Sequence, residues 1–261
     1  MSVIQLVGQP PDGFRFSFAS VSDFGLVSVM ATNGTLYLVA TPIGNLEDIT
    51  MRAVRILQEV DLIACEDTRT SRVLLNHYGI NKPVVSYHNF NERQASERII
   101  GRILEGQNVA VISDAGTPSI SDPGFIIVRE AVRQDINVVA IPGPAAMIMA
   151  VAVSGLPTDA FIFYGFLPQT SGKRRAILES LVDRRETMVF YESPYKIHKL
   201  LNEVFEVIGN RKAALCREMT KKFEEIIRGD IETIRGQLVE KKVKGELTLV
   251  VQGKVRKDMS L

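Results

Sequence analysis

The chain has 261 residues, of which 46% are hydrophobic and 23% charged, a balance typical of a soluble globular protein with one large or two small domains. No apolar stretch reaches the ~18–20 residues that a membrane helix requires, so the sequence predicts no membrane span. The two cysteines, Cys65 and Cys216, belong to no CxxC pair or Cys/His cluster. The sequence therefore indicates neither a disulfide framework nor a metal site, and it favours a reducing, cytoplasmic location.

The net charge of +1 conceals an uneven distribution of charge along the chain. Residues 1–143 carry 11 basic and 15 acidic side chains, whereas residues 144–261 carry 20 basic and 15 acidic ones. A basic half can attract a polyanion. Short clusters such as Lys173-Arg174-Arg175 and Lys221-Lys222 are candidates for phosphate contacts, and they are equally typical of an ordinary solvated surface.

The first 33 residues differ in composition from the rest of the chain. They contain Pro10-Pro11-Asp12-Gly13, scattered Ser and Phe, and little charge, and they lack the basic start and small-residue end of a signal peptide. Met30 stands just before the first regular strand pattern. We expect residues 1–33 to be a disordered leader or the product of a misassigned start codon, and residues 254–261 to be a tail.

Strand and helix patterns alternate from Thr35 onward. Thr50 is placed to cap a helix whose apolar residues recur at helical spacing. The strands show little polar alternation and are separated by helices, which predicts a parallel sheet covered on both faces. We expect strands at 36–40, 62–65, 84–87, 109–112 and 138–141, and helices at 50–60, 70–78, 92–104 and 122–134.

Pro142-Gly143-Pro144 interrupts this alternation and is a candidate hinge. The run at 224–228 follows the preceding strand too closely for a helical crossover, so their pairing should be antiparallel. The sequence therefore predicts an α/β fold with two domains, residues 34–143 with a mostly parallel sheet and residues 144–253 with a mixed sheet. In the second domain we expect strands at 161–166, 188–191, 213–217, 224–228 and 247–251, and helices at 144–153, 173–182, 194–208 and 231–240.

The loop at 113–124 is rich in small residues and carries Asp114 and Asp122 but no cation. It matches neither a dinucleotide fingerprint nor a phosphate loop. Carboxylates accept hydrogen bonds from hydroxyls and attract cations, so the loop suits a ligand such as S-adenosylmethionine, which has a ribose, an ammonium and a sulfonium. We favour this role for Asp114, whereas Asp122 is equally interpretable as the cap of the next helix.

Three further loops follow predicted strands. Residues 142–146 leave room for an adenine, or form a simple turn between domains. In the segment 64–70, Glu66 and Asp67 could act as a base or hold a basic partner, or Asp67 could cap a helix and be neutralised by Arg69. The segment 86–92 holds an aromatic, a histidine and two amides, which suit an unpaired nucleotide or a helix cap.

Taken in order, these loops resemble the ribosomal RNA small subunit methyltransferase I branch of the tetrapyrrole methylase superfamily, over roughly Thr35 to Gln252. The whole series in order is far more specific than any single motif. The motifs are LVATPIGNL at 38–46, EDTR at 66–69, SDAGTP at 113–118, SDPG at 121–124, IPGP at 141–144, GFLP at 165–168, YESP at 191–194, REMTK at 217–221 and KGE at 244–246.

The resemblance implies two α/β domains with S-adenosylmethionine bound in the cleft between them, and a homodimer. It implies 2′-O-methylation of a cytidine in the decoding region of small-subunit (16S) ribosomal RNA, with the assembled small subunit as the substrate. Thr170, Ala160 and Lys196 depart from the family pattern and concern the RNA contacts. The implied cofactor-binding residues are Thr41, Pro42, Asp114, Ala115, Gly116, Thr117, Pro118, Ser119, Ser121, Pro142, Leu167 and Thr248.

Methyl transfer to a ribose hydroxyl, a weak acid, should benefit from a nearby base or from a cation that stabilises the alkoxide, and it requires no metal. Polar residues at strand ends are therefore the candidates for catalysis. Two other functions remain open, a tetrapyrrole methyltransferase of the same fold and a non-catalytic RNA-binding factor in ribosome assembly. The candidate catalytic residues are Glu66, Asp67, Arg69, His88, Glu92, Arg217 and Glu218.

Overall fold

The computed structural model describes residues 33–239 and 242–255. The leader expected at 1–33 lies outside the described residues except for Asn33, and the tail expected at 254–261 lies outside them except for Lys254 and Val255. Within the described ranges, no helix is long and apolar enough to cross a membrane.

The first half of the chain forms the expected parallel sheet, in the strand order β3-β2-β4-β1-β5. All four pairings between neighbouring strands are parallel. Every residue of β2 and β4 is buried, which explains why their sequences show no polar alternation. The strands are β1 (Thr35–Val39), β2 (Leu62–Cys65), β3 (Val84–Ser86), β4 (Val109–Ile112) and β5 (Asn137–Ile141).

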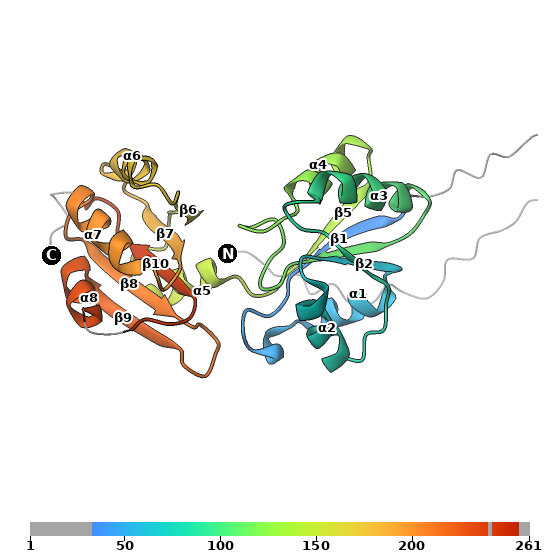
Figure 1. The fold of residues 1–261 in the computed structure, drawn as a ribbon, viewed down its shortest axis with the longest axis horizontal. Helices are drawn as coiled ribbons and strands as arrows, with labels where there is room; N and C mark the ends of the chain where they lie inside the picture. The colour runs from blue at the N-terminus through green and yellow to red at the C-terminus, as the bar shows by residue number, and fades with distance from the viewer. Residues whose placement is uncertain (1–32, 240–241, 256–261) are drawn as a thin grey trace, which may run out of the picture. The chain divides into compact units, whose positions relative to one another are not determined.

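Helices cover both faces of this sheet (Figure 1), as the sequence predicts. One core contains Leu57 of α1 and Leu75 of α2, and the other contains Ile103 of α3 and Ile127 of α4. Thr50 caps α1, because its hydroxyl accepts a hydrogen bond from the N–H of Ala53 at 3.1 Å. The helices are α1 (Met51–Glu59), α2 (Thr68–His77), α3 (Glu92–Leu104) and α4 (Phe125–Arg133), with a short 3₁₀ turn, η1 (Leu46–Asp48), before α1.

The second half forms a mixed sheet in the order β6-β7-β10-β8-β9. Strands β6 and β7 are parallel, and the other three pairings are antiparallel. The predicted antiparallel pairing of the run at 224–228 with the strand before it is confirmed. The strands are β6 (Phe161–Phe166), β7 (Thr187–Glu192), β8 (Lys212–Arg217), β9 (Glu225–Asp230) and β10 (Leu247–Val251).

Three helices pack on one face of the mixed sheet and a fourth on the other. Phe190 and Leu249 belong to the core under α6, α7 and α8, whereas Val189 and Val250 face α5. Ile43, from the loop after β1, joins the core on the α5 side. The division into domains at residues 143 and 144 stays a prediction. The helices are α5 (Ala146–Ser154), α6 (Ser171–Leu181), α7 (Ile197–Val207) and α8 (Ile231–Leu238).

The helix expected to start at Asp122 starts later. Helix α4 begins at Phe125, and its N-cap residue is Gly124, with φ of 148°. Asp122 is therefore not the cap of this helix, and that interpretation was wrong. The whole segment up to Gly124 remains part of the loop, which leaves the Asp122 side chain available to the cavity described below.

Candidate functional site

A cavity of about 390 Å³ lies among the loops at the strand ends of both sheets. Four carboxylates line it, those of Asp114, Asp122, Glu192 and Glu246, and no Lys, Arg or His of the described residues does so. The volume is in the range of small-molecule sites. Such a lining attracts cations and hydroxyl groups and repels phosphates, because like charges repel in a poorly solvated space.

The loop after β4 is held in place by the loop after β1. Thr41 and Gly116 exchange backbone hydrogen bonds of 2.8 and 3.0 Å, and the Thr41 hydroxyl donates to the carbonyl of Ser113 at 3.0 Å. Thr41 is itself buried and does not line the cavity. These hydrogen bonds of Thr41 hold residues 114–117 of the loop after β4 in a fixed path along the cavity wall.

Two non-glycine residues of the same loop adopt the left-handed backbone region, Ser119 with φ of 71° and Ser121 with φ of 64°. Side chains rarely tolerate this region, and such strain is concentrated at functional sites. The Ser119 hydroxyl is buried without a hydrogen-bond partner in the described part of the chain. A Cβ at Gly124 would come within 2.1 Å of that hydroxyl, so the loop can close on itself only with glycine there.

Carboxylates crowd together behind the loop. Burial and the charge of Glu66 raise the pKa of Asp122 to about 6. Burial raises the pKa of Glu66 as well, and the charge of Asp114 adds to this effect. Asp67 differs, because its hydrogen bonds with Arg69 lower its pKa to about 2. The backbone N–H of Asp67 donates to Asp114 at 3.1 Å, which joins the two loops. A bound cation would relieve the repulsion among these acids.

Residues 35–235 match the family model of Tetrapyrrole (Corrin/Porphyrin) Methylases. The chain belongs to the tetrapyrrole methylase family.

Within this family, the methylase matches relatives named ribosomal RNA small subunit methyltransferase I. It is 47% identical to the one from Halalkalibacterium halodurans, over 84% of this chain and 76% of that protein. It is also 47% identical to the one from Thermotoga maritima, over 85% of this chain and 99% of that protein. The branch that the sequence motifs indicate is therefore confirmed.

Solved structures confirm the fold of the methylase. Diphthine synthase superimposes with a TM-score of 0.66 at 16% identity, over 87% of this chain and 92% of that one. Uroporphyrin-III-C-methyltransferase from Thermus thermophilus does so with a TM-score of 0.59 at 20% identity, over 83% and 94%. At these identities the likeness concerns the fold alone.

The predicted cofactor residues of the methylase divide into two groups. Asp114, Ala115, Gly116, Thr117, Ser121 and Thr248 line the cavity. The other six are not among the lining residues. Thr41 is hydrogen-bonded to the lining residue Gly116, and four others are next to a lining residue in the chain: Pro42, Pro118, Ser119 and Leu167. Pro142 is three positions before the lining residue Ala145. Thr41 acts on the cavity through the loop after β4, and Leu167 is buried in the core under α6 and α7. The assignment of all twelve residues to the cofactor stays a proposal.

Sequence reasoning missed most of the apolar wall. Ile43, Phe166, Met219 and Leu247 line the cavity and were not among the predicted site residues. Polar side chains at strand ends were the signal that selected candidates, and apolar residues give no such signal. Phe166 and Met219 nevertheless lie inside the quoted motifs GFLP and REMTK, so the motifs had marked their loops.

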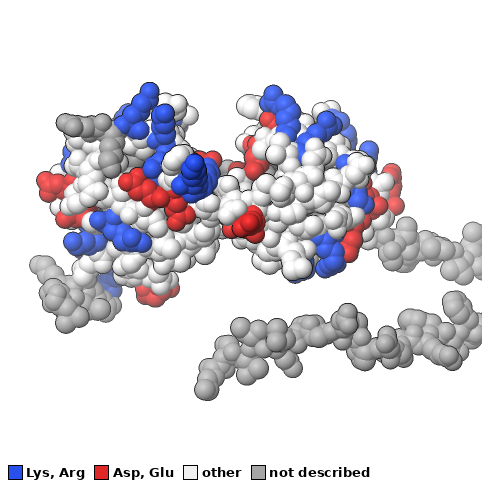
Figure 2. Space-filling view, turned by 90° about the horizontal axis from the view of Figure 1, so that it is seen from below, with Lys and Arg blue, Asp and Glu red and all other residues white. Residues whose placement is uncertain are grey.

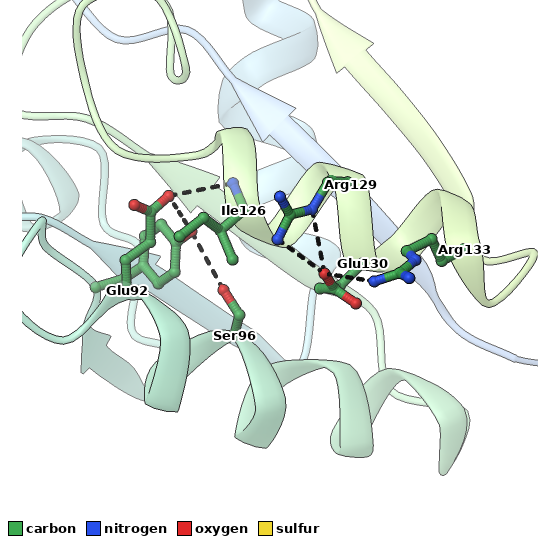
Figure 3. Close-up of polar contacts among 7 residues, drawn as sticks. Glu92, Ser96, Ile126, Arg129, Glu130 and Arg133 are labelled. Carbon is green, nitrogen blue, oxygen red and sulfur yellow. Dashed lines mark hydrogen bonds and ion pairs between the residues drawn. The ribbon is translucent and has the colours of Figure 1, made fainter.

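Glu92, a candidate base, holds the start of a neighbouring helix. Its Oε1 accepts hydrogen bonds from the Tyr87 hydroxyl at 2.9 Å and from the backbone N–H groups of Gly124 and Ile126 at 3.0 and 3.3 Å. Figure 3 shows the carboxylate at the start of α3 turned toward Ile126 of α4. A negative charge is stabilising at a helix N-terminus. The contacts indicate that Glu92 positions the end of the loop at 113–124.

Arg217 and Glu218, two other candidate catalytic residues, also form ion pairs. Arg217 forms an ion pair with Glu225 at 3.0 Å. Glu218 forms one with Lys221 at 2.9 Å, and Lys221 reaches Glu246, a lining residue, at 3.0 Å. None of the seven candidates is among the lining residues of the cavity. Glu66, Asp67, Arg69 and His88 belong to the acid-rich region behind Asp114, where the Nδ1 of His88 is buried without a hydrogen-bond partner in the described ranges.

Two expected phosphate contacts have other roles. The Arg174 side chain is buried and paired with Glu203, so it cannot reach a phosphate. Lys221 is occupied by Glu218 and Glu246. On the face drawn in Figure 2, Lys and Arg gather in several separate clusters, with Asp and Glu between them. The basic surface is therefore divided rather than continuous on that face.

Proposed function

We propose that this methylase transfers a methyl group from S-adenosylmethionine to the 2′-hydroxyl of a cytidine in the decoding region of small-subunit (16S) ribosomal RNA. Two observations support the proposal. The relatives at 47% identity are named as methyltransferases of the small ribosomal subunit RNA. The cavity is lined by four carboxylates and, among the described residues, by no basic side chain, which suits a cationic nucleoside.

The lining residues fit this methyl donor. When bound, S-adenosylmethionine supplies a methyl group on a positively charged sulfur. Asp114 and Asp122 would hold its cationic and hydroxyl groups, and Ile43, Met219 and Leu247 would form the apolar wall against its adenine. Burial, and then the charge of Glu66, disfavour the ionised form of Asp122, as its raised pKa indicates. Binding a cation converts this penalty into affinity.

The chain must also remove a proton from the ribose hydroxyl. Glu66 is the candidate carboxylate whose pKa is raised, by burial first, which brings it closer to the range useful for a general base. We propose Glu66 as the proton acceptor; it does not line the cavity but lies behind the lining residue Asp114, with Asp67 and His88 beside it. We propose Arg69 as a contact for a phosphate of the RNA, because its side chain stays 90% exposed while it pairs with Asp67. Glu92, Arg217 and Glu218 act by holding loops in place.

The proposed substrate is the assembled small subunit, and the proposed acting form is a homodimer in the cytoplasm. The experiment that tests the function uses small subunits purified from a strain that lacks this protein. They are incubated with the methylase and S-adenosylmethionine labelled in the methyl group, and the modified nucleotide is mapped. We expect label on one cytidine ribose of the decoding region.

Two variants sharpen this experiment. Asp114→Asn should abolish donor binding in calorimetry and labelling together, whereas Asp183→Asn, an exposed carboxylate outside the cavity lining, should behave like the wild type. Label on a base, or on a tetrapyrrole offered instead of subunits, would contradict the proposal. Subunit binding without any affinity for the donor would identify a non-catalytic assembly factor instead.

A further inference from the structure

An exposed phenylalanine stands at the edge of the cavity. Phe166 is the last residue of β6 and lines the cavity, yet 62% of its surface is exposed. Among the other apolar lining residues, Ile43, Met219 and Leu247 are buried, and Ile120 is 38% exposed, so Phe166 is the exposed aromatic of this wall. An aromatic ring left in water at the edge of a binding cavity is unfavourable until a partner covers it.

A β-bulge places the ring on this face. Phe163 pairs with Val189, but the next paired residue is Gly165, opposite Phe190, so Tyr164 is an extra residue in β6. Phe163 packs with α5 and Tyr164 with the opposite core. Strict alternation would therefore send Phe166 to the side of Tyr164, away from α5. The bulge reverses the alternation, as bulges near active sites commonly do.

Glycine is required at the bulge. Gly165 has φ of 59°, in the left-handed region. A Cβ at this position would lie 2.6 Å from the Ser121 hydroxyl, in the loop that carries Asp114 and Asp122. The end of β6 is thus packed directly against the loop at 113–124, and Phe166 is held next to the acid-lined part of the cavity.

The neighbours of Phe166 fix its position without covering it. Its ring meets that of Tyr191 edge to face, with centroids 5.6 Å apart. Tyr191 is in turn held by the backbone N–H of Met147, which donates to its hydroxyl at 3.1 Å, and by Phe163 at 4.9 Å between centroids. A flat ring fixed at its edge and exposed over most of its surface is a suitable platform for stacking.

We propose that Phe166 is the platform on which the base of the target nucleotide stacks when its ribose enters the cavity. This inference rests on the proposed function and names the contact by which the RNA is positioned. Single-stranded RNA is recognised largely by stacking unpaired bases on aromatic side chains. The donor's adenine has a buried apolar wall available at Ile43, Met219 and Leu247, whereas the polymer must approach from the solvent side, where Phe166 is exposed.

The test compares Phe166→Leu, which keeps an apolar side chain but removes the flat ring, with Phe166→Tyr, which keeps the ring. Phe125→Leu is the matched control, because Phe125 is 66% exposed and does not line the cavity. Three quantities are measured for each variant: the KM for small subunits, the Kd of S-adenosylmethionine by calorimetry, and the mass in solution.

We expect Phe166→Leu to raise the KM for subunits roughly 5- to 100-fold, the range of one stacking interaction, with donor affinity and mass unchanged. Phe166→Tyr and Phe125→Leu should each keep the wild-type KM. A wild-type KM for Phe166→Leu would overturn the inference. A weakened donor affinity would also overturn it, because the ring would then contact the donor's adenine. A smaller mass would do the same, because the ring would then contact a second copy of the chain. If the wild type itself labels no ribose, it is the proposed function that fails.

Discussion

The buried ion pair between α6 and α7 gives the sharpest prediction of stability. The Arg174 side chain is 1% exposed and that of Glu203 is 7% exposed. The Nε and Nη2 of Arg174 donate to the two carboxylate oxygens, and the Ser171 hydroxyl donates to the same carboxylate at 2.6 Å. Arg174 also donates to the carbonyl of Pro168 at 3.1 Å, just beyond the end of β6.

Glu203→Ala should lower the free energy of unfolding by about 3–5 kcal/mol, because it leaves the Arg174 guanidinium buried without its counter-charge. For a chain of this size that corresponds to a fall in Tm of roughly 6–20 °C. The double variant Arg174→Leu, Glu203→Leu should lose less than Glu203→Ala alone, since neither charge is then left unpaired. Urea unfolding followed by circular dichroism measures all three proteins.

The pH dependence of the same pair has a definite sign. The hydrogen bond from Arg174 lowers the pKa of Glu203 below its unfolded-state value. Its stabilisation is therefore present above the unfolded-state pKa and is lost as the pH falls through the folded-state pKa. Glu203→Gln should weaken the loss of stability in acid. A loss below about 1 kcal/mol for Glu203→Ala, or a double variant that loses at least as much as Glu203→Ala, would refute the reasoning.

Three further variants test the loop at 113–124. Asp122→Asn should raise the free energy of unfolding by about 1–3 kcal/mol at pH 8 and not at pH 4. The reason is that the folded-state pKa of about 6 penalises the ionised carboxylate only above that pH. The same variant should weaken the binding of S-adenosylmethionine, measured by calorimetry. Glu92→Ala should cost about 1–3 kcal/mol in urea unfolding by leaving the N–H of Gly124 without its acceptor, whereas Glu92→Gln should cost less. Gly165→Ala should cost about 1–2 kcal/mol for its left-handed backbone alone, and it should reduce donor affinity because its Cβ would displace Ser121.

The fold could be predicted because its signals are local. Strands β2 and β4 are buried at every position, and their sequences show it as unbroken apolar runs. Thr50 stands in the expected capping position, and the closeness of β8 and β9 in sequence fixed their antiparallel pairing. These features depend on residues near one another in the chain, so periodicity and spacing are sufficient to predict them.

The parts of the site that were missed depend on contacts between distant residues. Glu92 is 32 residues from Gly124, and nothing local indicates that it stabilises the start of α4. The bulge that turns Phe166 is a property of its pairing with β7. Arg174 is an instructive exception, because it precedes Leu178 and Leu181 at helical spacing on the buried face of α6. The sequence analysis treated Arg174 as part of a basic surface cluster with Lys173 and Arg175, although its helical spacing from the two leucines already indicated a buried position.

The proposed reaction places two opposite demands on electrostatics, and the lining of the cavity meets only one of them. Four carboxylates favour a cationic donor and repel the phosphates of an RNA strand. A nucleotide that enters must therefore present its uncharged ribose and base, while its phosphates stay outside, near basic side chains such as that of Arg69, whose exposed fraction is large. This explains why an aromatic rather than a basic residue stands at the edge of the cavity. This arrangement also predicts that added salt weakens subunit binding, because it screens the outer phosphate contacts. The ratio of the KM of Phe166→Leu to that of the wild type should stay constant as the salt concentration rises, because stacking involves no charge.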